Sequence, residues 1–295
     1  MTGCEAPGKD SGADILVSVI IPVYNSSAFI AETLDSIVEQ KLPGSGMRLE
    51  IIAVDDGSTD DSVDTIRNYV NNKNRKEKEK RKREAEAGCE EISAKSYVDS
   101  KPPVIRILEN DRKKGAAGAR NTGIAAAGGR YIAFIDSDDI WAEDKLSGQI
   151  AFMQERRCAF SFTGYEFADE EGRGTGKIVR VPDVISYREA LKNTTIFTST
   201  VMFDMEKLEK DDILFPFVES EDTANWWKVL RNKGDACGLD KPLTLYRRSA
   251  GTLSSNKMTA VRRIWRLYRR VEKLSLPYSI YCFCWYALRA VKRRV

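Results

Sequence analysis

Residues 15–27 read ILVSVIIPVYNSS, and the first seven of them form an apolar, β-branched run of strand length. A run of this kind is typical of a strand that is covered on both faces. Pro22 ends the run, and the polar residues from Asn25 onward can cap a helix. This stretch therefore predicts a buried strand, a short polar loop and the start of an amphipathic helix.

The same pattern returns three times along the chain. Apolar runs of strand length occupy residues 49–54, 104–108 and 131–135, and stretches with helical periodicity separate them. Strands that alternate with helices indicate βαβ units, a parallel sheet and right-handed crossovers. The predicted fold class is therefore α/β, with a mainly parallel central sheet flanked by helices.

Polar clusters follow three of these strands. Tyr24 and Asn25 come after the first strand, Asp55 and Asp56 after the second, and residues 136–139 (DSDD) after the fourth. Ligands of such sheets bind beyond the carboxyl ends of the strands. The sequence therefore predicts one site, built from all three clusters at a single edge of the sheet.

Asp136 and Asp138 place two carboxylates where a strand meets its loop. Carboxylates presented in this way suit Mg²⁺ or Mn²⁺, which take substrate phosphates as further ligands. An ordinary turn followed by a helix cap is the alternative, since Asp and Ser also favour that structure. An ordinary turn is also the alternative for Asp55 and Asp56. Their functional interpretation is that one of them, beside Tyr24, forms a pocket for a nucleotide base.

Arg120 follows a glycine-rich turn at Gly115 and Gly118. Such a turn lets the backbone approach a diphosphate while the arginine supplies charge, although tight packing of a helix is equally consistent with it. The fingerprints GxGxxG and GxxxxGK[ST] are both missing from the sequence, which argues against a dinucleotide oxidoreductase and a P-loop NTPase.

Asp222 and its neighbour Glu221 open a helix that carries two tryptophans. A capping acid is one interpretation, and a general base made more basic by its apolar surroundings is the other. The chain contains no histidine, so proton transfer must use carboxylate, Lys, Tyr or Cys.

The charge of the chain is unevenly distributed. The net charge is +3, yet residues 261–295 hold ten Lys or Arg and one acid, so a mildly acidic body carries a basic tail. The tail over residues 259–295 is predicted to form two basic amphipathic helices broken near Pro277. Such helices lie on anionic membranes, or else pack on the domain or on a second subunit.

The remaining segments complete the predicted organisation. Residues 1–13 are expected to be a flexible tail and residues 14–258 a single domain. The charged residues 71–101 are interpreted as a solvated, disordered insertion with some helical character. We expect no secretory signal and no membrane-spanning helix, because no apolar window reaches about 18 residues.

Five segments in this order resemble the family 2 glycosyltransferases of the GT-A fold. They are VSVIIPVYN (17–25), VDDGSTDDS (54–62), GAAGARNTGI (115–124), YIAFIDSDDIW (131–141) and ESED (219–222). The resemblance covers residues 15–258, apart from the charged insertion. The later segments FTGYEF, GLDKPLTLYRR and GTLSSNK resemble the subgroup that builds teichuronic acid, capsule and exopolysaccharide.

The resemblance implies an inverting enzyme that takes a sugar from a UDP-sugar with the help of Mn²⁺ or Mg²⁺. It implies that Asp55 holds uracil, that Asp138 binds the metal and that Asp222 takes the acceptor's proton. The residues expected to bind the donor are Pro22, Tyr24, Asn25, Asp55, Asp56, Arg120, Asp136 and Arg248.

The chain departs from the family in two places. Many relatives have a histidine near residues 248–251, where this chain has none, so Arg247, Arg248 or Lys257 is expected to supply the charge instead. The QxxRW motif of processive synthases is also missing, which predicts transfer of one sugar per encounter.

The predicted partners are a UDP-sugar donor, a polyprenyl-linked saccharide acceptor and a membrane surface contacted by the C-terminal basic helices. No nucleic acid is expected, a homodimer is a further expectation, and the predicted location is cytoplasmic, peripheral on the inner face of the cell membrane. The alternatives are a catalytically silent scaffold and a sugar-phosphate nucleotidyltransferase. The second needs a glycine-rich loop with Arg and Lys after the first strand, and PVYNSS is not one.

Overall fold

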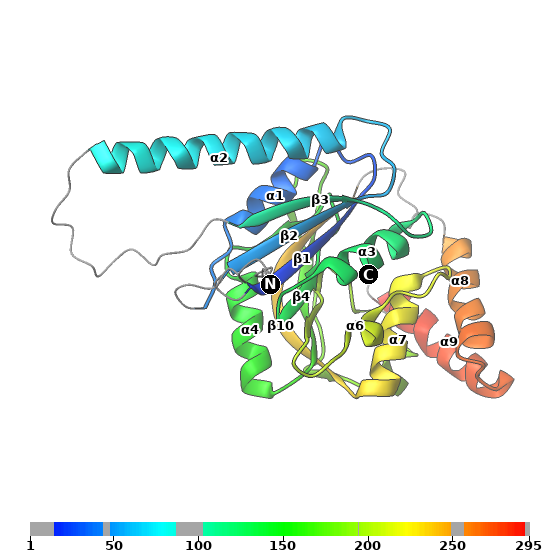
Figure 1. The fold of residues 1–295 in the computed structure, drawn as a ribbon. Helices are drawn as coiled ribbons and strands as arrows, with labels where there is room; N and C mark the ends of the chain where they lie inside the picture. The colour runs from blue at the N-terminus through cyan, green and yellow to red at the C-terminus, as the bar shows by residue number, and fades with distance from the viewer. Residues whose placement is uncertain (1–14, 44–47, 87–102, 194, 249–256, 293–295) are drawn as a thin grey trace, which may run out of the picture.

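The computed structural model describes residues 15–43, 48–86, 103–193, 195–248 and 257–292 (Figure 1). The tail predicted for residues 1–13 lies outside them. In the part of the chain that is described, a ten-stranded sheet lies between two layers of helices. The predicted α/β class is confirmed.

The four strands predicted from the apolar runs form one parallel block. In order across the sheet these strands are β3 (Val104–Glu109), β2 (Arg48–Asp55), β1 (Ile15–Val23) and β4 (Tyr131–Phe134). In the ladders on either side of β1, Val23 is opposite Asp55 of β2 and Ile20 is opposite Phe134 of β4. The carboxyl ends of these strands therefore meet at one edge, which we call the carboxyl edge.

The sheet continues beyond β4 as a mixed half. Its strands, in order, are β9 (Met202–Asp204), β6 (Phe160–Ala168), β10 (Ala236–Arg247) and β5 (Ile140–Trp141). Because β9 is antiparallel to both β4 and β6, and β10 is parallel to β6, the ends of β6 and β10 also reach the carboxyl edge. The strands that pair outside this order are β7 (Gly174–Val179) and β8 (Val184–Ile185).

Apolar side chains alternate along the strands into two core clusters, one on each face. Ile20 and Ile52 belong to the cluster covered by α3 (Ala116–Ala126) and α7 (Glu221–Lys233). The neighbouring strand residues belong to the cluster covered by α1 (Ile30–Val38) and α4 (Lys145–Arg156). Burial on both faces explains why these strands read as continuous apolar runs. The short helices are α5 (Tyr187–Ala190), α6 (Lys210–Ile213) and the 3₁₀ turn η1 (Thr198–Thr200).

The first part of the charged insertion is helical. Helix α2 runs from Ser62 to Glu86, so residues 71–86 have the helical character that the sequence analysis allowed for part of the insertion. Ile66 anchors the start of the helix in the core, and Lys, Glu and Arg are good helix formers, so a helix nucleated on the domain extends outward. Figure 1 shows α2 projecting past the sheet. Residues 87–101 of the insertion lie outside the described residues.

The tail forms the two predicted helices. Helix α8 (Lys257–Arg266) continues into a π-helical turn η2 (Leu267–Val271), and α9 (Leu276–Lys292) follows. The break lies at residues 272–275, and Pro277 sits in the first turn of α9, where its missing N–H has no helical partner to lose.

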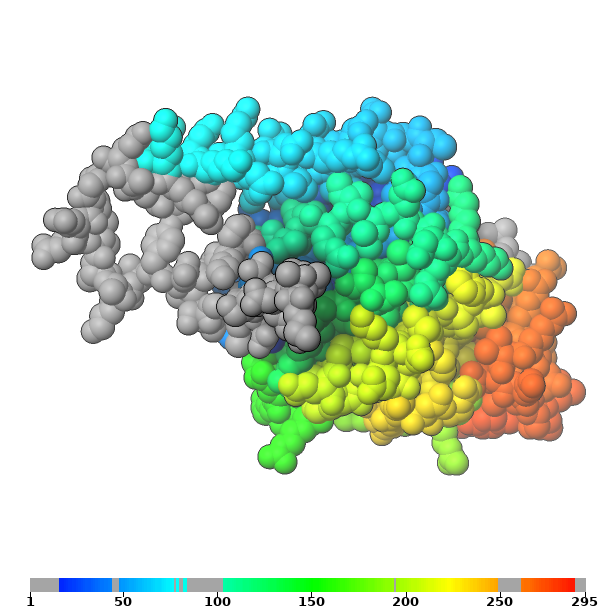
Figure 2. Space-filling view, viewed as in Figure 1, coloured from blue at the N-terminus to red at the C-terminus, as the bar shows by residue number. Residues whose placement is uncertain are grey.

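One face of the tail packs on the domain, which was one of the two alternatives left open. Tyr268 is buried and stacks on Trp227 with ring centroids 5.2 Å apart and an interplanar angle of 4°. Glu272 accepts a hydrogen bond from the hydroxyl of Tyr187 at 2.5 Å and forms an ion pair with Arg231. Figure 2 shows the tail helices against the side of the molecule. Among the helices described here, none is long and apolar enough to cross a bilayer.

Candidate functional site at the carboxyl edge

The acidic loop, residues 136–139, leaves the end of β4 and turns back on itself. The N–H of Asp139 donates to the carbonyl of Asp136 at 3.1 Å. Asp139 is fully buried and accepts from the Ser199 hydroxyl at 2.5 Å and from the Arg247 N–H at 3.1 Å. Asp139 therefore anchors the loop, while Asp136 and Asp138 remain partly exposed.

Burial and crowding raise the pKa of two carboxyl groups in this loop. Burial, reinforced by the charge of Asp136, raises the pKa of Asp138 to about 6. Burial also raises the pKa of Asp139 well above its ordinary value. Crowded carboxylates repel one another, and a divalent cation relieves that repulsion. In the part of the chain described here no three acidic or thiol side chains form a ready-made metal cluster. The loop fits a metal that takes one or two carboxylates and completes its shell with substrate phosphates.

Arg247 holds the acidic loop from the end of β10. Its side chain is 2% exposed, its Nε donates to the carbonyl of Asp138 at 2.8 Å, and its guanidinium forms an ion pair with Glu32. These contacts leave Arg247 committed to the loop. Arg248 is exposed, with its guanidinium carbon 4.3 Å from the Phe167 ring centroid, and the side chain of Lys257 lies outside the described atoms. Three residues were expected to replace the charge of the missing histidine. Among them, Arg248 is the one whose described side chain does not hold the acidic loop.

The base end of the site is built on β1 and β2. Pro22 and the exposed Tyr24 lie at the end of β1, and the Nζ of Lys114 is 5.1 Å from the Tyr24 ring centroid. Asn25 has φ of 48°, and its side-chain oxygen accepts from the N–H of Thr59 at 2.8 Å. Asp55 accepts from the N–H of Ser58 at 3.1 Å. The loops after the two strands are therefore joined by hydrogen bonds.

The carboxylate of Asp56 is buried and supports the neighbouring glycine turn. It is 9% exposed and accepts from the N–H of Gly115 at 2.8 Å and from Nδ2 of Asn110 at 2.6 Å. Gly115 has φ of 121°, a conformation that side chains rarely adopt. Asp56 thus fixes the glycine turn predicted to approach a diphosphate.

Arg120 joins the acidic loop to helix α7. Its guanidinium, 6% exposed, donates to Asp136 at 2.7 Å and to Glu221 at 3.2 Å, and it lies 5.2 Å from the Phe215 ring centroid. Burial raises the pKa of Glu221, and Arg120 opposes that rise. Arg120 was predicted to supply charge to the diphosphate, and in the structure its guanidinium lies between two carboxylates.

Asp222 is brought to the acidic loop by this contact. It follows Glu221 in the first turn of α7, where Ser220 has φ of 56° and Asp222 accepts from the N–H of Thr223 at 2.6 Å. Since Arg120 forms ion pairs with both Glu221 and Asp136, two residues that are far apart in the chain share one end of the site. The sequence did not indicate this role of Glu221 or the anchoring role of Ser199. The sequence signal that could have indicated the role of Ser199 is the run of three hydroxyl residues, 198–200, shortly before β9.

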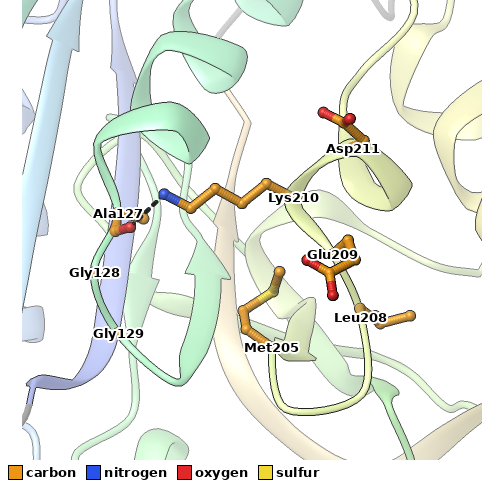
Figure 3. A pocket seen from close by; sticks show the side chains of 8 residues that line it. All are labelled: Ala127, Gly128, Gly129, Met205, Leu208, Glu209, Lys210 and Asp211. Atoms are coloured by element: carbon orange, nitrogen blue, oxygen red, sulfur yellow. Dashed lines mark hydrogen bonds between the residues drawn. The ribbon is translucent and has the colours of Figure 1, made fainter.

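A cavity of about 390 Å³ lies away from these residues (Figure 3). It is lined by residues 127–129, by Met205 and by residues 208–211. The Nζ of Lys210 donates to the carbonyl of Ala127 at 2.7 Å, beside the start of β4 rather than its carboxyl end. None of the predicted site residues lines this cavity.

Comparison with known proteins gives a family and a fold. The family described as Glycosyl transferase family 2 matches residues 18–88 and 87–213. TuaG of Bacillus subtilis, a glycosyltransferase named for teichuronic acid biosynthesis, is 38% identical over 95% of this chain and 98% of its own. WfgD of Escherichia coli, named a UDP-Glc:α-D-GlcNAc-diphosphoundecaprenol β-1,3-glucosyltransferase, is 33% identical over 85% of each chain.

Two solved structures share the fold. TarS of S. aureus, residues 1–349 with UDP-GlcNAc, superposes with a TM-score of 0.62 at 20% identity and covers 92% of this chain and 72% of its own. The mannosyltransferase PcManGT of Pyrobaculum calidifontis, with GDP-Man and Mn²⁺, gives 0.59 at 19% identity, covering 93% and 69%. The GT-A architecture of the chain is thereby established.

The Arg120 contact predicts a measurable loss of stability. In Arg120→Met, two partly buried carboxylates lose their shared cation, and the free energy of unfolding should fall by about 3 kcal/mol. Urea denaturation measures this, with Arg67→Met in an exposed pair with Asp64 as the control, expected to change by less than about 1 kcal/mol. A variant at Arg120 as stable as the control would contradict this account of the site.

Proposed function

The chain belongs to glycosyltransferase family 2, and from that premise we propose that it moves one sugar from a UDP-sugar to a lipid-linked saccharide, with inversion at the anomeric carbon. As a member it is a nucleotide-sugar-dependent glycosyltransferase of polysaccharide biosynthesis. The observation that carries the proposal is that Arg120 joins Asp136 of the acidic loop, which also contains Asp138, to Glu221, the neighbour of Asp222.

The donor is proposed to bind across β1 and β2. The exposed ring of Tyr24 offers a stacking surface for the base, and Asp55 lies beside it at the end of β2 as an acceptor for the uracil N–H. Pro22 and Asn25 shape the same loop, and Asp56 holds the glycine turn toward the diphosphate. Uracil is favoured because WfgD is named for UDP-Glc.

Asp138 is proposed to hold Mn²⁺ or Mg²⁺, with Asp136 toward the nucleoside. The ion, when bound, neutralises the charge that develops on the departing nucleoside diphosphate. PcManGT supports divalent metal use, since its structure contains Mn²⁺. Arg248, exposed at the end of β10, adds positive charge where relatives have histidine.

Asp222 is proposed to take the proton of the acceptor hydroxyl. That oxygen then attacks the anomeric carbon from the side opposite the leaving UDP, and the C–O bond to UDP breaks as the new bond forms. A single displacement of this kind inverts the anomeric configuration and needs no covalent sugar–enzyme intermediate. The absence of QxxRW from the sequence supports one transfer per encounter.

The outer face of α9 is proposed to contact the membrane that carries the acceptor. Its exposed large apolar side chains include Tyr281, Trp285 and Leu288, which are spaced four and three residues apart and share one face, while Leu276 and Ile280 are exposed nearer its start. Basic residues accompany them, and the guanidinium carbon of Arg289 is 5.8 Å from the Trp285 ring centroid. Apolar side chains with flanking cations suit an anionic interface. We place the protein on the cytoplasmic face of the cell membrane, as WfgD's diphosphoundecaprenol-linked acceptor suggests.

The donor proposal is tested by calorimetric titration of UDP with and without Mn²⁺. Asp138→Asn should weaken metal-dependent UDP binding by about tenfold or more, because a metal ligand is lost. Asp235→Asn, an exposed acid at the start of β10 on the opposite edge, should bind UDP as the wild type does. Wild-type protein that binds neither UDP nor another nucleoside diphosphate would favour the silent scaffold instead.

The base proposal is tested by turnover. Asp222→Asn should lower kcat by about a thousandfold while leaving UDP binding unchanged, because only the proton acceptor is removed. Transfer is measured from UDP-glucose to GlcNAc-diphosphoundecaprenol, with Asp211→Asn on α6 as the control. Turnover of Asp222→Asn within tenfold of the control would assign the base elsewhere.

The membrane proposal is tested by sedimentation with vesicles. Replacing Trp285 and Leu288 together by Ser should lower binding to phosphatidylglycerol vesicles by about tenfold or more. Ile178→Ser, an exposed apolar residue on β7, is the control. If the double variant changes the mass of the particle in solution and leaves vesicle binding intact, α9 is a contact between two copies of this chain.

A further inference from the structure

Four aromatic side chains gather at the carboxyl edge of the sheet, beside the acidic loop. They are Tyr165 and Phe167 of β6, Tyr246 of β10, and Phe197 in front of η1. The Tyr246 ring centroid lies 4.4 Å from that of Phe197 and 5.6 Å from that of Phe167, and Tyr165 lies 5.2 Å from Phe197. None of the four belongs to either core cluster. We call this group the aromatic platform.

The platform and the acidic loop are held by the same two chain segments. Phe197 lies two residues before Ser199, whose hydroxyl donates to Asp139 and accepts from the N–H of Asp136. Tyr246 directly precedes Arg247, whose N–H donates to Asp139. The backbone of these two segments therefore links the platform to the acidic loop.

The surface properties of the platform match those of a sugar ring. Tyr165 is buried, whereas Phe167, Phe197 and Tyr246 are half-buried and retain exposed area. Arg248 places an exposed guanidinium over the Phe167 ring. A pyranose has an apolar C–H face that packs on aromatic rings and hydroxyls that bind a neighbouring cation or water.

The position of the platform in the sheet separates it from the base end. Tyr24 and Asp55 belong to β1 and β2, on one side of β4 in the strand order, and β6 and β10 lie on the other side. The acidic loop at the end of β4 lies between them. A ligand on the platform is thus distinct from the base of the donor.

We infer that the aromatic platform binds the sugar ring of the acceptor saccharide, packing its C–H face against the exposed parts of Phe167, Phe197 and Tyr246. This inference rests on the proposed function, which supplies the donor on the other side of the acidic loop. The acceptor hydroxyl is thereby presented toward the carbon that it attacks.

The test uses saturation-transfer NMR on the full chain with Mg²⁺ and UDP present. The probes are the methyl pyranosides of glucose, galactose, mannose and N-acetylglucosamine. The wild type should saturate the ring C–H protons of at least one of them. Phe167→Leu and Phe197→Leu should each weaken that binding by about fivefold, because an aromatic face is lost while apolar volume is kept.

Phe152→Leu is the matched control, since Phe152 of α4 is also half-buried beneath an arginine, with Arg156 5.6 Å from its ring centroid. UDP calorimetry on each variant shows that it is folded. Absence of saturation transfer from every pyranoside, or an equal loss in Phe152→Leu, would overturn the platform while UDP binding upholds the donor site. Absence of UDP binding by the wild type would instead overturn the proposed function.

Discussion

A single buried guanidinium joins the two halves of this site. Arg120 binds Asp136 of the acidic loop with one nitrogen and Glu221 of helix α7 with another. Without this cation, two partly buried carboxylates would face each other unpaired, at a cost of several kcal/mol. The contact therefore stabilises the fold and sets where Asp222 lies relative to Asp138.

The carboxylates of the acidic loop repel one another, and hydrogen bonds hold the loop in place. Asp138 and Asp139 have raised pKa values, because Asp139 is buried and Asp138 partly buried, each near further negative charge. Ser199 and Arg247 hold the loop in place with hydrogen bonds to Asp139. Under the proposed function, a loop held in this crowded arrangement needs little reorganisation when a cation binds.

The tail packs on the domain and also exposes apolar side chains. Tyr268 of η2 stacks on Trp227 and fixes the tail to α7, the helix that has Asp222 in its first turn. Helix α9 buries Cys282 and exposes Trp285 and Leu288. Under the proposed function, membrane contact and the acceptor's proton acceptor are thus connected through one packed interface.

The sequence by itself determined the parallel block of strands, because burial on both faces demands continuous apolar runs, and the position of Asp138, because strand ends are polar. The two tail helices were predicted from the basic, amphipathic pattern of the tail. Only the tertiary structure decided that Arg247 is committed to the acidic loop and that Glu221 shares Arg120 with Asp136. The physical reason is distance along the chain. Periodicity and turn chemistry act between near neighbours, whereas these contacts join residues that only the folded sheet brings together.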